Sequence, residues 1–124
     1  MTEKKQILVI EDDEDVRNSL VRHLEYWGFY AWAAEDGEEG LRLAMQVLPN
    51  LIILDLSIPK LPGSEVCKTL KENQDKRYRQ IPIIMLTGRV DEADQVLGRV
   101  IGASFYMTKP FRAEDLLEQI NRFT

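Results

Sequence analysis

Cysteine, histidine and long apolar runs are scarce in this 124-residue sequence, and each scarcity excludes a class of protein. The single Cys67 excludes an internal disulfide, and because His23 and Cys67 each stand alone, there is no His/Cys cluster for zinc. No apolar run approaches the roughly 20 residues of a membrane span, and no signal-peptide pattern is present. We therefore expect a cytoplasmic protein that does not bind membranes.

Basic residues are also in the minority. Lys and Arg number 16 against 21 Asp and Glu, and the formal net charge of −5 argues against direct binding to nucleic acid. The sequence contains no linker and no low-complexity segment, and its length suits one core. We expect a single domain over residues 1–124.

Short apolar runs alternate with amphipathic segments along the sequence. The runs predict five strands, over residues 7–10, 29–34, 51–55, 81–86 and 104–107. Apolar residues at helical spacing predict five helices, over residues 16–24, 41–48, 66–70, 91–101 and 116–123. Residues 71–80 are interpreted as a polar connection. This alternation favours an α/β fold with a parallel sheet, right-handed crossovers and helices on both faces.

Asp55 closes a strand of four consecutive apolar residues, Leu51 to Leu54. Burial of a carboxylate without a partner costs several kcal/mol or forces it to stay protonated, so a cation, hydrogen-bond donors or reactive chemistry is expected nearby. Pro59, Pro62 and Gly63 follow and predict a shaped loop in place of a helix. Asp55 is therefore expected at the mouth of a buried strand.

Polar side chains follow three other strands: Glu11 and Asp12, Thr87, and Lys109. Ligands of open α/β sheets bind outside the carboxyl ends of the strands, so these side chains could converge with Asp55. Three neighbouring carboxylates need a cation, and Mg²⁺ prefers such oxygen ligands. A carboxylate beside Mg²⁺ can attack a phosphoryl group, whose charge Lys109 would counter. Taken singly, Lys109 could equally be a solvated surface cation and Thr87 an ordinary strand residue.

The segment after the first strand carries more charge than such a site needs. The run Asp13 to Asp15 is interpreted as the first turn of a helix, where acids are stabilised by the helix dipole, and Arg17 as surface of the same helix.

The sequence resembles a response-regulator receiver domain over nearly all of its length. The matching pieces stand in family order and comprise Ile7 to Asp13, Leu51 to Asp55 with Pro59 and Gly63, Leu86 to Gly88, and Gly102-Ala103 with Tyr106 to Phe111. The resemblance implies a flavodoxin-like, doubly wound five-stranded parallel sheet in the order 2-1-3-4-5, with five helices.

The resemblance also implies what the site residues do. Asp55 would accept phosphate, Glu11 and Asp12 would hold Mg²⁺ together with Asp55 and the backbone carbonyl of Ser57, and Thr87 and Lys109 would contact the phosphoryl group. Tyr106 would act with Thr87 as a switch. Glu11 departs from the more usual Asp, and Pro62 precedes Gly63 where many receivers have Asp.

The implied protein is a phosphoacceptor switch, not an enzyme, that takes part in its own phosphorylation and slow dephosphorylation. Its phosphate would come from a sensor histidine kinase or a histidine phosphotransfer protein. A downstream effector protein would bind the face formed by the helix at residues 91–101, the strand with Tyr106 and the helix with Leu116.

Two other functions need residues that this sequence lacks. A Mg²⁺-dependent phosphohydrolase with an Asp nucleophile would want a second acid two residues after that Asp, where Ser57 stands. A flavodoxin-like cofactor carrier would need a hydroxyl- and glycine-rich phosphate loop after the first strand. The sequence has Glu11-Asp12-Asp13 there, which would repel anions.

Overall fold

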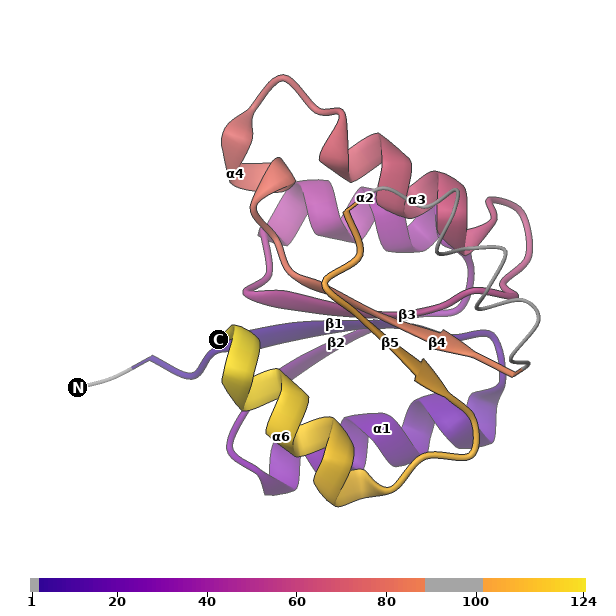
Figure 1. Cartoon of the computed structure of the whole chain (residues 1–124), viewed down its shortest axis with the longest axis vertical. Helices are drawn as coiled ribbons and strands as arrows, with labels where there is room; N and C mark the ends of the chain where they lie inside the picture. Colours follow the sequence, from indigo (N-terminus) through magenta and orange to yellow (C-terminus); the bar gives the residue numbers. More distant parts are fainter. Residues whose placement is uncertain (1–2, 89–101) are drawn as a thin grey trace.

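A computed structural model describes residues 3–88 and 102–124 of the chain. Its five parallel strands form one sheet in the order β2-β1-β3-β4-β5 (Figure 1), which confirms the predicted flavodoxin-like, doubly wound α/β fold. The strands are β1 (Gln6–Ile10), β2 (Tyr30–Ala34), β3 (Leu51–Asp55), β4 (Ile83–Thr87) and β5 (Phe105–Thr108).

Helices cover both faces of the sheet (Figure 1). The described helices are α1 (Glu14–Tyr26), α2 (Gly37–Val47), α3 (Gly63–Lys71), α4 (Lys76–Arg79) and α6 (Ala113–Phe123). One core lies between the sheet and α2 and α3, and the other lies between the sheet and α1 and α6. None of the described helices is long and apolar enough to cross a membrane.

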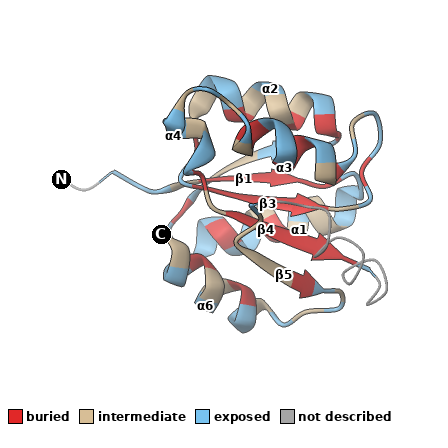
Figure 2. Cartoon of the chain, turned by 45° about the horizontal axis from the view of Figure 1, so that its top comes forward, coloured by how far each residue is buried: buried red, intermediate tan, exposed pale blue. Residues whose placement is uncertain are grey.

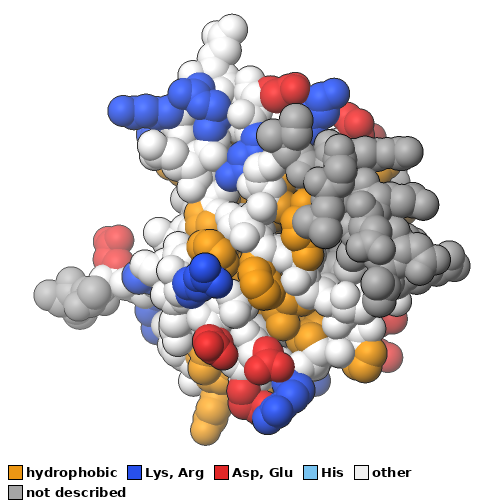
Figure 3. Space-filling view, viewed as in Figure 1, with side chains coloured by type: hydrophobic (Ala, Val, Ile, Leu, Met, Phe, Trp, Pro, Cys, Tyr) orange, Lys and Arg blue, Asp and Glu red, His pale blue; other side chains and the backbone are white. Residues whose placement is uncertain are grey.

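The structure differs from the prediction over residues 71–80. Residues 71–80 are not a plain connection, because they contain α4, whose basic side chains project from one end of the molecule (Figure 3). The carboxylate of Asp75 begins this helix by accepting a hydrogen bond of 2.9 Å from the Arg77 N–H. The helix predicted over residues 91–101 lies outside the described residues.

The central strands are buried on both sides because each of their faces meets helices (Figure 2). Alternate residues of β1 enter different cores: Leu8 and Ile10 face α2 and α3, and Ile7 and Val9 face α1 and α6. β2 lies at the edge and is less buried, with the Tyr30 side chain 49% exposed. The sheet therefore has a rigid centre that ends at the carboxyl edge in β1, β3 and β4.

Side chains of aspartate begin α1 and α2. Asp13 accepts a hydrogen bond of 3.1 Å from the Val16 N–H, and Asp36 accepts one of 2.8 Å from the Glu39 N–H. Asp15 lies in the first turn of α1. The interpretation of Asp13 to Asp15 as residues of a helix N-terminus is confirmed.

The loop between β3 and α3 packs against the start of α2. Gly37 donates its N–H to the Pro59 carbonyl at 3.2 Å, and a Cβ atom at Gly37 would lie 1.9 Å from the carbonyl oxygen of Leu61. Only glycine leaves room for so close an approach of backbone to backbone. The loop that follows Asp55 is thus fixed from the side of α2.

We expect Gly37→Ala to lower the free energy of unfolding by about 2 kcal/mol or more, because backbone must move to admit the methyl group. Urea denaturation followed by circular dichroism measures this. Gly88→Ala is the matched control, because a Cβ there meets no atom of the described residues within 4 Å, and it should change stability by less than about 1 kcal/mol. Equal losses in the two variants would contradict close packing at Gly37.

Candidate functional site

The carboxyl ends of four strands bring the predicted site residues to one edge of the sheet. Glu11 directly follows β1, Asp55 and Thr87 are the last residues of β3 and β4, and Lys109 directly follows β5. The Lys109 N–H donates to the Thr87 carbonyl at 2.7 Å, which extends the β4–β5 ladder by one step. The structure therefore places Glu11, Asp55, Thr87 and Lys109 at the same edge of the sheet, where the topology predicted them.

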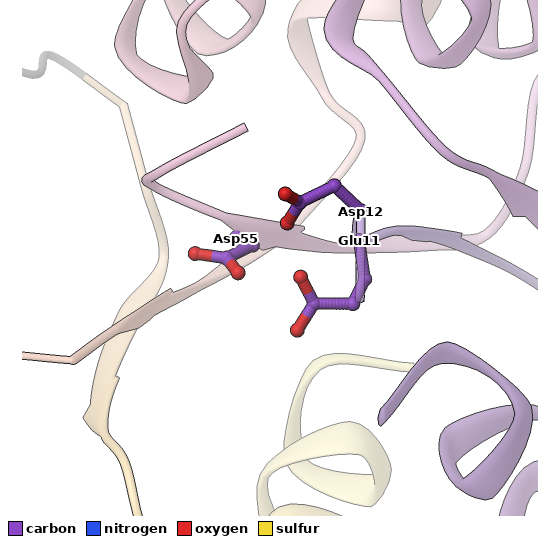
Figure 4. A group of neighbouring side chains, drawn as sticks. All are labelled: Glu11, Asp12 and Asp55. Atoms are coloured by element: carbon purple, nitrogen blue, oxygen red, sulfur yellow. The ribbon is translucent and has the colours of Figure 1, made fainter. Parts of the chain in front are cut away.

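Three carboxylates form a compact group there (Figure 4). Glu11, Asp12 and Asp55 each offer an oxygen atom, and these oxygens all lie within 4.8 Å of one another. Glu11 and Asp55 are 1% and 5% exposed, whereas Asp12 is exposed to solvent. The group is thus buried on the sheet side and open on the Asp12 side.

A single ammonium group pairs with both buried carboxylates. Lys109 Nζ lies 2.9 Å from Glu11 Oε1 and 2.9 Å from Asp55 Oδ2. Asp55 Oδ1 accepts a further hydrogen bond of 3.0 Å from the Ser57 N–H. Both Asp55 oxygens are satisfied, but Glu11 Oε2 is buried and has no hydrogen-bond donor among the described residues.

The surroundings shift the pKa values of the two buried acids, Glu11 and Asp55, in opposite directions. Burial, followed by the neighbouring Asp55, raises the pKa of Glu11 to about 7. Burial alone would raise the pKa of Asp55, but hydrogen bonds with Glu11, Lys109 and the Ser57 N–H outweigh it and lower that pKa. A proton on Glu11 therefore gives it a hydrogen bond to Asp55, and Asp55 is the acid that stays ionised.

Lys109 remains charged in this setting. Burial alone would lower the pKa of Lys109, but its hydrogen bonds to Glu11 and Asp55 outweigh that effect and raise it. The site therefore holds one permanent cation beside two buried carboxylates, an arrangement that leaves negative charge uncompensated whenever Glu11 ionises.

The donor set fits a hard divalent cation. One oxygen each of Glu11, Asp12 and Asp55 lies within 4.8 Å of the others, and Glu11 Oε2 is buried without a hydrogen-bond donor among the described residues. Ser57 contacts Asp55 through its N–H, and its side chain is exposed. The proposed role of the Ser57 carbonyl as a ligand stays a prediction.

Thr87 and Tyr106 lie on the neighbouring strands β4 and β5. Thr87 is 1% exposed and pairs with Thr108 across the β4–β5 ladder. Tyr106 pairs with Met85 and packs against the core that contains Cys67. Burial, and then the neighbouring Cys67, raises the pKa of the Tyr106 hydroxyl. The coupling of the two residues as a switch stays a prediction.

Arg17 makes contacts with the segment that carries Glu11 and Asp12, and the sequence did not predict them. It is not plain helix surface: its Nη1 donates to the Glu11 carbonyl at 2.9 Å and to the Asp12 carbonyl at 3.2 Å. The available signal was its position three and seven residues before Leu20 and Leu24, which places it beside the buried stripe of α1.

A second acidic group does not make a comparable site. Oxygens of Glu35, Asp36 and Glu39 also lie within 4.8 Å of one another. However, the Asp36 carboxylate caps α2 and lies 3.5 Å from Lys60 Nζ, and Glu35 is exposed. These contacts account for the group structurally.

Known proteins resemble this chain along most of its length. The response regulator receiver domain family matches residues 7–121. The alkaline phosphatase synthesis transcriptional regulatory protein PhoP of Bacillus subtilis is 44% identical over 112 residues, which cover 90% of this chain and 45% of that protein. Response regulator MprA of Mycolicibacterium vanbaalenii is 39% identical over 115 residues, covering 93% of this chain and 48% of that protein. The chain spans about half the length of the curated relatives it matches.

Solved structures give the same result. The chemotaxis response regulator CheY4 of Vibrio cholerae superimposes with a TM-score of 0.87 at 28% identity, covering 98% of this chain and 100% of that one. The signal receiver domain of a signal transduction histidine kinase from Syntrophus aciditrophicus gives 0.87 at 32% identity, covering 96% and 89%.

The pKa of Glu11 predicts a pH dependence of stability. Folding raises this pKa from 4.5 to about 7, so protonated Glu11 contributes to the free energy of unfolding. This contribution is fully present below pH 4.5 and is lost as the pH rises through 7. In EDTA, the unmodified protein should therefore lose about 2 kcal/mol of unfolding free energy through Glu11 between pH 5 and pH 8, and Glu11→Gln should lack this loss. Urea titrations at the two pH values measure it.

The control for this experiment is Glu25→Gln, which removes an exposed acid from α1. Its stability should follow that of the unmodified protein at both pH values. Parallel behaviour of Glu11→Gln would show that Glu11 titrates in the folded protein much as it does in the unfolded chain.

Proposed function

Since the chain belongs to the response regulator receiver domain family of two-component signalling, we propose that Asp55 accepts a phosphoryl group from a phosphohistidine of a partner protein. The observation that carries this proposal is a buried, ionised carboxylate at the carboxyl edge of the sheet, held by Lys109 and the Ser57 N–H. Of the two buried acids, Asp55 is the one whose pKa its surroundings lower.

In the transfer, one carboxylate oxygen of Asp55 attacks phosphorus, the P–O bond forms as the P–N bond to the partner's imidazole breaks, and the imidazole leaves with the bonding electron pair. The Asp55 group changes from a carboxylate to an acyl phosphate and gains negative charge. Lys109, which already contacts Asp55 Oδ2, is placed to counter it. Thr87, next in the ladder, would donate its hydroxyl to a phosphoryl oxygen.

Mg²⁺ would be held by Glu11, Asp12, Asp55 and the carbonyl of Ser57. When bound, it supplies positive charge that offsets the charges of the carboxylates and of the phosphoryl oxygens. The buried Glu11 Oε2 and the spacing of the carboxylate oxygens support this assignment.

Partners are proposed at the level of protein class. Receiver domains work with sensor kinases, and we infer a histidine kinase or a histidine phosphotransfer protein as the donor. The switch would use Thr87 and Tyr106, and the effector would bind beside β5 and α6. The third part of that face, the helix at residues 91–101, lies outside the described residues. Direct binding to nucleic acid is not proposed, and the cytoplasmic location and the single-domain organisation stay predictions.

The phosphohydrolase alternative has less support. It needs a second acid two residues after the nucleophile, and Ser57 there contributes a backbone N–H and an exposed hydroxyl side chain. A phosphoacceptor that keeps its phosphate needs no such acid. The protein is therefore proposed as a switch that is itself phosphorylated.

Asp55→Asn should abolish phosphoryl uptake and leave the fold intact, because the amide is close in shape to the acid but is a far poorer nucleophile. Intact-protein mass spectrometry after incubation with acetyl phosphate and Mg²⁺ should show one added phosphoryl group in the unmodified protein and none in the variant.

Asp36→Asn is the matched control for that measurement. Asp36 is also a buried acid, 7% exposed, and Asn can cap α2 as Asp does. This variant should still gain one phosphoryl group. Uptake by Asp55→Asn, or its loss in both variants, would contradict Asp55 as the acceptor.

Asp12→Ala should bind Mg²⁺ about tenfold or more weakly, yet melt at no lower a temperature than the unmodified protein in EDTA. The reason is that Asp12 is exposed and its charge repels Glu11 and Asp55 when no cation is present. Calorimetric melting with and without Mg²⁺ measures both effects, since a bound cation raises the melting temperature by mass action. A clear fall in EDTA would instead make Asp12 a structural residue.

A further inference from the structure

Arg17 joins the first helix to the segment that carries two of the carboxylates. Its Nη1 donates to both the Glu11 carbonyl and the Asp12 carbonyl, at 2.9 and 3.2 Å. A planar guanidinium holds such a pair of acceptors in a fixed direction. Because both acceptors are backbone carbonyls, these contacts fix the path of the backbone and do not pair with the carboxylate charges.

The helix end of this contact is itself held in place. Arg17 is half-buried and lies three and seven residues before Leu20 and Leu24, which are buried against the sheet at 4% and 0% exposure. The Asp13 cap and the Arg17 N–H bond of 2.8 Å to the Asp13 carbonyl fix the first turn of α1. The guanidinium therefore starts from a rigid base.

The Glu11–Asp12 segment, which accepts the Arg17 hydrogen bonds, is held on its other side by the sheet. The Glu11 N–H donates to the Ala34 carbonyl of β2 at 3.0 Å, which continues the β1–β2 ladder beyond Ile10. Glu11 is thus bound to the sheet by its N–H and to α1 by its carbonyl. The backbone between β1 and α1 has little freedom, and the Glu11 and Asp12 side chains project from fixed positions.

We propose that Arg17 is a positioning residue for cation binding: it fixes the Glu11–Asp12 backbone so that both carboxylates face Asp55. This inference rests on the cation site of the proposed function and adds a residue outside the ligand set. Preorganised ligands bind more tightly because less conformational freedom is lost on binding.

The proposal makes a prediction opposite in sign to simple electrostatics. A positive charge near a cation site weakens cation binding, so removing Arg17 should tighten binding if only its charge mattered. If Arg17 positions the ligands, its removal should weaken binding. The direction of the change therefore separates the two roles.

The test measures Mn²⁺ binding to the folded protein by the electron paramagnetic resonance signal of free Mn²⁺. Arg17→Ala and Arg17→Met should each raise the Mn²⁺ dissociation constant about tenfold, because neither side chain can donate to the two carbonyls. Arg17→Met keeps the apolar stem of the arginine and so retains its packing. Circular dichroism checks that each variant is folded.

Arg22→Ala is the matched control, because it removes one exposed positive charge from the same helix. It should change the dissociation constant by less than twofold. Tighter or unchanged binding in Arg17→Ala would overturn the proposal, and so would binding in Arg17→Met equal to that of the unmodified protein.

A second readout separates positioning from a general loss of function. In Arg17→Met, phosphoryl uptake from acetyl phosphate should need about tenfold more Mg²⁺ for half its maximal rate, while the rate at saturating Mg²⁺ stays within twofold. A fall in the saturating rate with an unchanged Mg²⁺ requirement would overturn the proposal. Failure of the proposed function gives a different result, in which the unmodified protein takes up no phosphoryl group at any Mg²⁺ concentration.

Discussion

Two buried carboxylates share one ammonium group at the carboxyl edge of the sheet, and the rest of the site depends on this contact. Lys109 lies 2.9 Å from both Glu11 and Asp55, which are almost completely buried. Burial of a charge is costly unless it is paired, so one lysine cannot fully stabilise two ionised acids. Burial and the neighbouring Asp55 raise the pKa of Glu11, whereas hydrogen bonds with Glu11, Lys109 and the Ser57 N–H outweigh burial and lower the pKa of Asp55.

The fold keeps these groups from moving apart to relieve the repulsion. The carboxyl ends of β1, β3 and β5 carry Glu11, Asp55 and Lys109, respectively. Hydrogen bonds between the strands of the sheet fix these ends relative to one another. The loop after Asp55 is packed closely, since a Cβ atom at Gly63 would lie 2.7 Å from the Asp55 carbonyl oxygen. Interiors packed in this way do not yield gradually to a local repulsion. The strain therefore stays at the site.

The sequence predicted those features that local patterns encode. Buried central strands read as unbroken apolar runs, and polar residues directly after them marked the edge where Glu11, Asp55 and Lys109 meet. α4 was missed because its four residues include no buried one and so leave no apolar period. The contacts of Arg17 were missed because a sequence gives spacing along a helix but not the distance from its side chain to another segment.

The unpaired oxygen of Glu11 connects stability with function. Within the part of the chain that the structure describes, Oε2 is buried without a hydrogen-bond donor, which is unfavourable for folding alone. Glu11 belongs to the group of acids whose spacing suits a divalent cation. A fully satisfied carboxyl at this position would stabilise the apo protein and leave the cation one ligand fewer. The cost of the unpaired oxygen is therefore understandable as a requirement of the site, in line with the strain that functional sites commonly retain.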